Sequence, residues 1–404
     1  MSESPQDPTL AIHGGRPVRD TLLPYGRHLF TDADIAAVAE VLRSDWITTG
    51  PKVAEFEEGV AAAVGARHAV SFTSGTAALH GAVFAAGLGP GDEAVTAPLT
   101  FCATANAVLY QGATPVFADI RADTLTIDPS EVKRRITPRT KALLPVDFAG
   151  HPADLDELMA VADQHGLVII EDAAHALGAR YRGRPVGSIS HMSIFSFHPV
   201  KHLTTGEGGI VTTDSADLAG RLRIFRSHGI ASDARTRQAQ GQWYYEMTAL
   251  GFNYRLTDFA CALGLSQLPR LGANLARRRE IAGEYEARLS GTPAVTLPAA
   301  SAWIEHAWHL YPVRVDAAIR ADVFRALQAE GLRVNVHYIP VHLHPYYRDR
   351  FGYRGGDFPV AEGAYAGLIS LPMFHGMTDH DADDVVTAVR KVMAYFGSGA
   401  YASR

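Results

Sequence analysis

The chain has 404 residues, of which 47% are hydrophobic and 20% are charged. This is the composition of an ordinary soluble globular protein, long enough for a large domain and a smaller one. The formal net charge of −6 argues against nucleic acid as the main partner, and no apolar stretch approaches the length of a membrane span. The first residues are polar and acidic, unlike a signal peptide, and two scattered cysteines cannot form a disulfide framework, so a cytoplasmic location is expected.

Three regions follow one another along the chain. Residues 1–30 are irregular and rich in glycine and proline, and we predict an arm that is able to cross to a partner subunit. Residues 31–260 are predicted to form a large cofactor-binding domain, and residues 261–404 a linking helix and a smaller α/β domain. In chain order the patterns predict helices over 34–43 and 52–64, a strand over 68–72, a helix over 76–86, strands over 94–97, 115–118, 142–146, 167–171 and 192–197, and further helices over 101–111, 155–165, 259–289, 322–330 and 381–395. A strand over 309–313 belongs to the last region. Such alternation predicts βαβ units in a mostly parallel sheet flanked by helices, with ligands bound beyond the carboxyl ends of the strands.

A lysine and an aspartate stand just beyond two of these strands. Asp172 directly follows the strand over 167–171, and Lys201 follows the strand over 192–197 by a few residues. Pyridoxal phosphate needs this pair of residues, because a lysine forms a Schiff base with its aldehyde and a carboxylate keeps its pyridine nitrogen protonated. An aspartate alone is commonly a helix cap and a lone lysine is usually a solvated side chain, but the combination favours the cofactor.

Small residues after the first strand predict a phosphate site. The loop Thr73-Ser74-Gly75-Thr76 opens a predicted helix, so that backbone N–H groups of Gly75 and Thr76 are able to approach an anion. Ser196 at the end of its strand is a further phosphate ligand, and Asn253 is another, suited to approach from a second subunit. A capped helix start is the plain alternative for the loop.

Aromatic and basic residues complete the candidate site. Phe101 follows a strand end and is a candidate to stack on the pyridine ring, although a place in the core would suit it equally. His175, three residues after Asp172, is a candidate to orient that carboxylate or to contact the ring hydroxyl. Neither a cysteine ligand nor a helical HExxH spacing accompanies the histidines of 337–344, so we predict no metal. The substrate candidates, for each of which a structural role is equally open, are Arg226 and Arg255 for a diphosphate and His228, His337, Tyr338 and His342 for the sugar or the amino donor.

Together these residues resemble the DegT/DnrJ/EryC1/StrS family of sugar aminotransferases, from the turn over 46–51 to the last helix. The resemblance implies the type I, aspartate aminotransferase-like fold of enzymes that use pyridoxal phosphate, and a homodimer whose active sites draw on both subunits. It implies phosphate binding by Ser74, Gly75, Thr76, Ser196 and, from the other subunit, Asn253; stacking by Phe101; a ring-nitrogen contact by Asp172; a ring contact by His175; and the Schiff base by Lys201.

Several segments resemble more narrowly the family members that act in pseudaminic acid biosynthesis, among them 171–178, 196–209, 225–230, 243–268, 336–338 and 369–373. That resemblance implies transfer of an amino group from L-glutamate to C4 of a UDP-linked 4-keto-6-deoxy-N-acetylhexosamine. The opening segment 10–19 looks instead like relatives that act on antibiotic sugars or cyclitols, so another 3-keto or 4-keto substrate stays open. Relatives that dehydrate a keto-sugar at C3 have histidine in place of the lysine, and a non-catalytic binding protein of this fold would lose Lys201 or Asp172; both residues are present.

Overall fold

A seven-stranded sheet forms the centre of the computed structural model, which describes residues 9–232, 237 and 240–397. Its strand order is β2-β10-β9-β6-β5-β3-β4, and only β10 runs antiparallel to its neighbours. The six strands predicted from the sequence for this region are present with ends shifted by at most two residues. The strands are β2 (His68–Phe72), β3 (Glu93–Thr96), β4 (Thr114–Phe117), β5 (Thr140–Leu144), β6 (Val168–Asp172), β9 (Met192–Ser196) and β10 (Gly209–Thr213).

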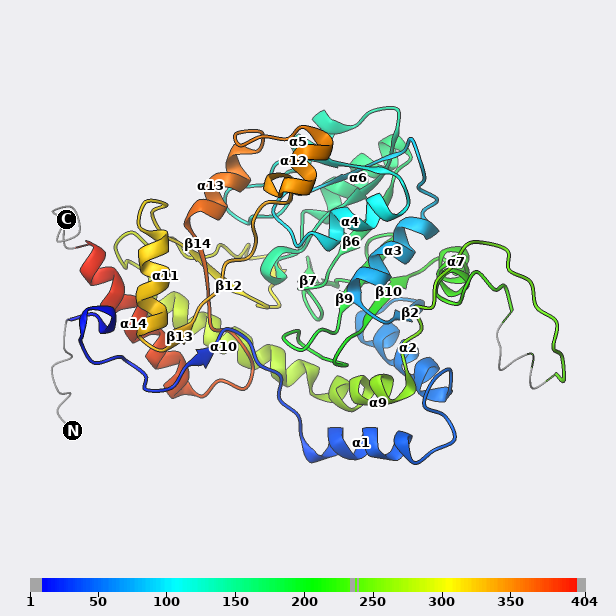
Figure 1. Ribbon diagram of the computed structural model, residues 1–404, viewed down its shortest axis with the longest axis horizontal. Coiled ribbons are helices and arrows are strands. Elements are labelled where there is room, and N and C mark those ends of the chain that lie inside the picture. Colours follow the sequence, from blue (N-terminus) through cyan, green and yellow to red (C-terminus); the bar gives the residue numbers. More distant parts are fainter. Residues whose placement is uncertain (1–8, 233–236, 238–239, 398–404) are drawn as a thin grey trace.

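Helices cover both faces of this sheet, because its strands are apolar on both sides (Figure 1). Alternate residues of a strand point to opposite faces. Val70 and Ile170 pack with α3 (Gly75–Ala85), α4 (Ala103–Tyr110) and α7 (Ala216–Arg226). Their neighbours Ala69 and Ile169 face the other side, where α2 (Pro51–Val64), α5 (Pro129–Arg135) and α6 (Leu155–His165) lie. Together with the parallel strands, these two helical layers make the large α/β unit.

Local signals in the sequence fix where these helices begin and end. Ser74 caps α3, since its Oγ accepts a hydrogen bond from the Ala77 N–H at 3.1 Å. Proline is the first residue of α2, and Gly65 ends that helix in the left-handed conformation at φ 73°. These caps explain why α2 and α3 lie within a residue of their predicted bounds.

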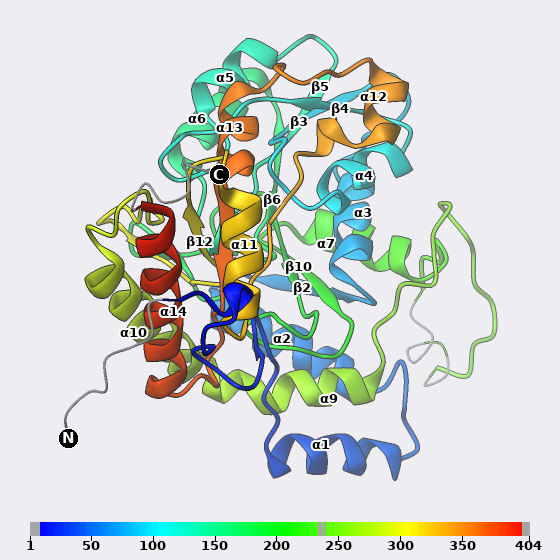
Figure 2. The ribbon, with the colours of Figure 1, turned by 60° about the vertical axis from the view of Figure 1, so that its left-hand side comes forward.

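A second apolar core lies beside the large unit, at the left-hand end of the molecule in Figure 1 and at its lower left in Figure 2. It is built from the antiparallel strands β12 (Tyr311–Arg314) and β14 (Leu368–Leu371) with α10 (Leu271–Leu289), α11 (Arg320–Ala329) and α14 (Asp379–Gly397). The long helix predicted over 259–289 is interrupted, since α9 (Asp258–Gln267) ends in a 3₁₀ turn over Leu268–Arg270 before α10 begins. Pro269 lies in that turn and breaks the hydrogen-bond ladder. Helix α1 (Asp32–Leu42) packs on α9 through the Asp34 carboxylate, which accepts hydrogen bonds from Ser266 and Arg270.

The described residues of the N-terminal arm dock on this second core of their own chain. Strand β1 (Leu23–Pro24) pairs in parallel with β13 (Leu332–Arg333), and the side chains of Leu10 and Leu23 are buried there. The buried Glu330 carboxylate accepts hydrogen bonds from the Ala11 N–H at 2.9 Å and the Val18 N–H at 3.0 Å. Residues 1–8 of the predicted arm lie outside the described residues.

Short elements connect these units. A small sheet joins β11 (Ile304–Glu305), β7 (Arg180–Tyr181) and β8 (Arg184–Pro185). Helices α12 (Pro345–Phe351) and α13 (Pro359–Gly367) pack beside β4 through Tyr347 and Phe358, both of which contact Phe117. Single 3₁₀ turns occupy Ala11–His13, Phe148–Gly150 and Val341–Leu343. None of the helices within the described residues is long and apolar enough to cross a membrane.

Candidate active site

A cavity of about 540 Å³ opens at the carboxyl ends of β2, β6 and β9. Parallel strands of this kind of sheet present their carboxyl ends at one edge, which is where ligands bind in such folds. Ten of the residues predicted from the sequence meet there although they come from distant segments. They are Ser74, Gly75, Thr76, Phe101, Asp172, His175, Ser196, Lys201, His337 and Tyr338.

The amine of Lys201 lies inside the cavity. Burial lowers the pKa of Lys201 to about 7, the Asp172 carboxylate acts against this shift, and the Arg278 guanidinium adds to it. The Lys201 Nζ lies 3.4 Å from Nε2 of His309. The amine is therefore unprotonated in a large fraction of molecules at neutral pH, as a nucleophile or a general base requires.

The carboxylate of Asp172 is held by two hydrogen bonds at the end of β6. Its Oδ2 accepts a hydrogen bond from the Thr104 hydroxyl at 2.7 Å, and its Oδ1 accepts one from the Ala174 N–H at 3.2 Å. Burial raises the pKa of Asp172, whereas Thr104, Ala174 and Lys201 all act to lower it. Both hydrogen bonds are donated to the carboxylate, so they favour its charged form and orient it toward a cation in the cavity.

The start of α3 forms a tight cradle with β9 and β10. A Cβ atom added to Gly75 would lie 3.1 Å from Ser196 Cβ and 3.2 Å from its Oγ, so any larger residue would have to push Ser196 aside by a few tenths of an ångström. A Cβ atom on Gly209 would lie 2.4 Å from the Ser74 carbonyl oxygen. The first N–H groups of a helix have no acceptor within the helix and attract anions. The cradle therefore combines the N–H groups of Gly75 and Thr76, which find no acceptor within the described part of the chain, with the Ser196 hydroxyl, and this donor set suits phosphate.

An aromatic wall closes another side of the cavity. The rings of Phe101 and Tyr338 lie 5.7 Å apart between centroids, and the Tyr338 hydroxyl lies 3.1 Å from His175 Nε2. His337 Nδ1 lies 2.9 Å from the Ser370 hydroxyl, and burial lowers the pKa of His337 to about 4, so this ring is neutral at pH 7. Phe101 is 57% exposed, so its ring is available to a ligand.

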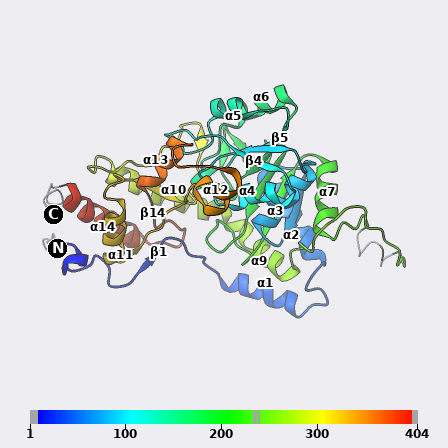
Figure 3. The same cartoon turned by 45° about the horizontal axis from the view of Figure 1, so that its top comes forward.

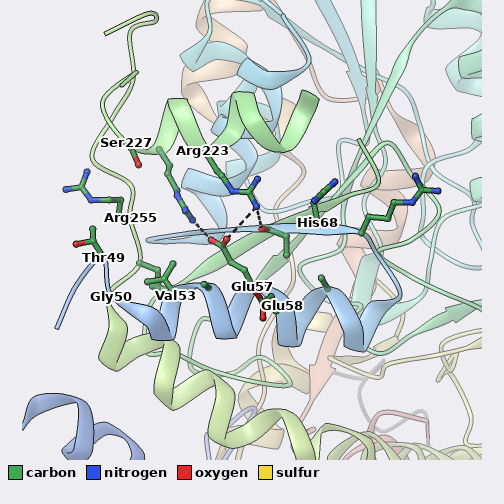
Figure 4. A pocket seen from close by; sticks show the side chains of 15 residues that line it. Thr49, Gly50, Val53, Glu57, Glu58, His68, Arg223, Ser227 and Arg255 are labelled. Atoms are coloured by element: carbon green, nitrogen blue, oxygen red, sulfur yellow. Dashed lines mark hydrogen bonds and ion pairs between the residues drawn. The ribbon is translucent and has the colours of Figure 1, made fainter. Parts of the chain in front are cut away.

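Two of the predicted arginines line a second cavity, of about 770 Å³, beside β2 and α2 (Figure 4). This cavity shares no lining residue with the first, as far as the described residues show. Arg226 donates hydrogen bonds to the Glu57 carboxylate and to the Ser71 carbonyl oxygen, whereas Arg255 points away from Glu57. Burial and the neighbouring Arg226 lower the pKa of Arg255.

The remaining predicted residues also lie away from the first cavity. Asn253 is exposed and forms a β-bridge with Ser227, and His228 is exposed beside it. His342 is fully buried, 2.9 Å from the Glu362 carboxylate and packed on Phe358, which gives it a structural role instead of a substrate contact. Its place in a short apolar turn, Val341–Leu343, explains why its side chain turns to the core.

Several residues of the cavity were not predicted from the sequence. Tyr25 and Asn335 line it from the arm and from the chain after β13, and His309 reaches Lys201 from a segment 108 residues away. No local pattern marks these three positions. Thr104 carries a weak signal, since it lies one helical turn after Thr100, at the start of a helix that follows a strand end.

Similarity to known proteins agrees with this geometry. The fold is that of the fold type I aminotransferases, which use pyridoxal phosphate. The chain belongs to the DegT/DnrJ/EryC1/StrS aminotransferase family, whose model matches residues 29–390. It is 46% identical over 381 residues to the spore coat polysaccharide biosynthesis protein SpsC of Bacillus subtilis, with 93% of this chain and 98% of that protein covered.

Two solved structures extend the comparison. A putative sugar aminotransferase from Streptococcus pneumoniae in its PMP form is 32% identical with a TM-score of 0.88, over 92% of this chain and 99% of that one. Helicobacter pylori PseC, an aminotransferase involved in the biosynthesis of pseudoaminic (pseudaminic) acid, is 31% identical with a TM-score of 0.87, over 93% of this chain and 100% of that one. The predicted fold class, cofactor and family are thereby confirmed.

Proposed function

We propose that this sugar aminotransferase moves an amino group from L-glutamate to C4 of a UDP-linked 4-keto-6-deoxy-N-acetylhexosamine, in nucleotide-sugar biosynthesis of the pseudaminic acid type. The observation that supports amino transfer best is the Lys201 amine, with its pKa lowered to about 7, in one cavity with the hydrogen-bonded Asp172 carboxylate. The choice of sugar is supported by similarity to PseC, an aminotransferase of pseudaminic acid biosynthesis, and to SpsC, a polysaccharide biosynthesis protein. The C4 position and the UDP group rest on the sequence segments that resemble such enzymes.

The residues of the cavity fit pyridoxal phosphate. The cradle of Gly75, Thr76 and Ser196 would hold its phosphate, Asp172 its pyridine nitrogen, and Phe101 and His175 the faces of its ring. When bound, this cofactor would supply an aldehyde carbon that takes up the amino group and a ring that accepts the electron pair left when the substrate carbon loses its proton. That electron sink is effective only while the ring nitrogen stays protonated, which the charged Asp172 carboxylate favours.

Lys201 then acts as the proton carrier. In the glutamate half-reaction its neutral amine takes the proton from the α-carbon of glutamate. In the sugar half-reaction its ammonium group gives a proton to C4 of the acceptor sugar. An amine with a pKa near 7 serves in both directions, because neither protonation state is strongly preferred at neutral pH. Tyr338 and His337 lie on the aromatic wall, where hydroxyl and neutral imidazole groups suit contacts to a sugar.

We also propose that two copies complete each other's active sites. Asn253 and Arg255 lie outside the Lys201 cavity of their own chain, at the base of the segment after α7 that stands away from the body of the molecule (Figure 3). That segment exposes large apolar side chains, with Trp243 84% and Leu250 77% exposed. Cover by a second copy would bury these side chains and bring Asn253 to the partner's phosphate cradle. Arg226 is already paired with Glu57, so Arg255 is the better candidate of the two arginines for a substrate phosphate.

Following the colour of the bound cofactor through both half-reactions tests this function. L-Glutamate should bleach the purified enzyme, and after its removal a UDP-linked 4-keto-6-deoxy-N-acetylhexosamine should restore the colour. Below pH 7 the bleaching rate should rise about tenfold per pH unit and then level off, because the neutral form of Lys201 does the work.

Replacement of the lysine supplies the control. Lys201→Ala should fold and bind the cofactor but lose turnover, so normal multiple turnover by this variant would contradict the mechanism. Bleaching without recovery on the 4-keto sugar would move the acceptor to 3-keto sugars or cyclitols. Absence of bleaching with any amino donor would overturn the proposed reaction.

A further inference from the structure

The backbone of His309 is fixed on three sides. Its N–H donates to the Ala149 carbonyl oxygen at 2.9 Å, and its own carbonyl accepts a hydrogen bond at 3.4 Å from the guanidinium of Arg278, a fully buried residue. Gly150 allows the two segments to approach, because a Cβ atom there would lie 2.9 Å from the Trp308 nitrogen and 3.1 Å from that of His309. These contacts hold the backbone, and with it the Cα–Cβ bond of His309, in one orientation.

That side chain is directed at the amine of Lys201. Its Nε2 lies 3.4 Å from Lys201 Nζ, a long contact of the kind seen before ligands bind. The His309 ring also packs on the ring of His175, with 4.3 Å between the two ring centroids. The His309 ring is buried, and burial together with Lys201 and its neighbours holds its pKa well below the usual value, so the imidazole is neutral.

The surroundings of Nδ1, the second ring nitrogen of His309, indicate which nitrogen carries the imidazole proton. Nδ1 of His309 is buried and has no hydrogen-bond partner within the described residues. A buried N–H group without an acceptor is costlier and rarer than a buried acceptor without a donor. The proton therefore belongs on Nε2, which makes this nitrogen the donor and the Lys201 nitrogen the acceptor.

We propose that His309 is a positioning residue for Lys201. The Nε2–H group of His309 donates a hydrogen bond to the neutral Lys201 amine and holds it in the cavity while the amine is joined to neither cofactor nor substrate. This inference rests on the proposed role of Lys201 in the transfer reaction. An ammonium group has no lone pair to accept this hydrogen bond, so His309 favours the neutral state of the amine. The charged and titratable groups that act on Lys201 or lie around it are Asp172, His175, His198, His202, Arg278, His309 and His337.

The test measures the protonation of Lys201 directly. In the full-length protein freed of cofactor, the rate at which acetic anhydride labels Lys201 is followed against pH by peptide mass spectrometry. His309→Leu removes the donor and should raise the midpoint of labelling by about one pH unit, which lowers the labelling rate about fivefold at pH 7 and about tenfold well below the midpoint. His309→Gln keeps an N–H donor near the same place and should restore most of the wild-type midpoint.

His202→Gln is the matched control, because His202 is also a buried histidine of this cluster but bonds to the Ala307 carbonyl oxygen. It should leave the Lys201 midpoint near that of the wild type. In the holoenzyme, His309→Leu should shift the acid limb of the glutamate half-reaction upward by the same amount, with little change in KM for glutamate.

An unchanged or lowered midpoint in a folded His309→Leu protein would overturn the inference, as would an equal shift in His202→Gln. If His309→Leu fails to fold, the labelling midpoints of His309→Gln and His309→Asn are compared instead. The shorter amide of asparagine no longer reaches the Lys201 amine, so His309→Asn should raise the midpoint as leucine does. The labelling readout is independent of turnover, so failure of the proposed reaction would leave its result interpretable.

Discussion

At the scale of single residues, the Thr104 hydroxyl decides how firmly Asp172 is held. It donates to Asp172 Oδ2 at 2.7 Å within a buried cluster, and it favours the charged carboxylate. A hydrogen bond to a charged group is worth about 1.5–3 kcal/mol, so Thr104→Val should lower kcat by about 10- to 100-fold. The reason is a raised pKa of Asp172 and a weaker hold on the protonated ring nitrogen; kcat of the purified holoenzyme is the measurement.

Thr104→Ser keeps the hydroxyl and serves as the control, with kcat expected within about threefold of the wild type. A purely structural role for Thr104 would lower the melting temperature and leave kcat per cofactor-loaded subunit unchanged. That result would contradict the assignment of Thr104 to Asp172.

The predictable site residues were those whose neighbours in sequence reveal them. Asp172, Ser196 and Lys201 stand at strand ends, and Gly75 opens a helix, so local patterns place all four at one edge of the sheet. His309 and Tyr25 were not predictable, because their partners are set by tertiary packing between segments far apart in the chain. Asn253 was predicted to serve the site of a second copy, and Arg255 to meet a substrate phosphate. Both lie outside the cavity of their own chain, and both stay predictions because the partner's position cannot be read from one chain.

At the scale of elements, the arm depends on one buried carboxylate. Glu330 closes α11 and accepts hydrogen bonds from two arm N–H groups and from Lys391 Nζ at 2.9 Å. Glu330→Gln removes the charge and leaves one of these donors without an acceptor, so we expect the free energy of unfolding to fall by about 2–4 kcal/mol. Urea denaturation followed by circular dichroism measures this change.

Glu280→Gln is the matched control, because Glu280 pairs with Arg277 on the exposed side of α10. Its effect should stay within about 0.5 kcal/mol. If the two variants lost equal stability, the carboxylate would not be the anchor of the arm. Faster proteolysis within residues 9–30 of Glu330→Gln would locate the loosened element.

Element boundaries were predictable where caps and periodicity agree, as in α2, α3 and α6. Strand β10 was not predicted, since its apolar run follows a glycine-rich segment that is typical of a loop. Its pairing with both β2 and β9 depends on contacts that no local pattern reveals. The interruption at Pro269 was also missed, because the apolar periodicity continues across it.

At the scale of the whole molecule, the proposed sharing of each active site between two copies predicts that two inactive variants restore activity when they are mixed. Asn253→Ala and Lys201→Ala should each be nearly inactive alone. The first variant lacks a ligand of the cofactor phosphate, and the second lacks the reactive amine. In a mixed dimer one site combines intact Lys201 with intact Asn253, so refolding the two variants together in equal amounts should restore about a quarter of wild-type activity. Activity of the mixture is measured against each variant treated in the same way.

No recovery, with dimers shown by light scattering, would mean that Asn253 serves the cavity of its own chain. A monomer in solution would contradict the proposed dimer outright. Wild-type protein carried through the same refolding step gives the reference.

The docking of the arm on the second core sets an order for the making of this protein. Residues 9–24 meet residues 330–333 through Glu330 and the pair β1–β13, and the His13 ring lies 5.3 Å from that of Tyr395. A ribosome delivers these partners some three hundred residues apart, so the sheet of the large unit is complete before the arm has anything to bind. The arm therefore has no native partner until residues 330–333 have been synthesised. Tyr25 lies at the end of this arm, so the wall of the cavity that it forms also depends on residues synthesised late.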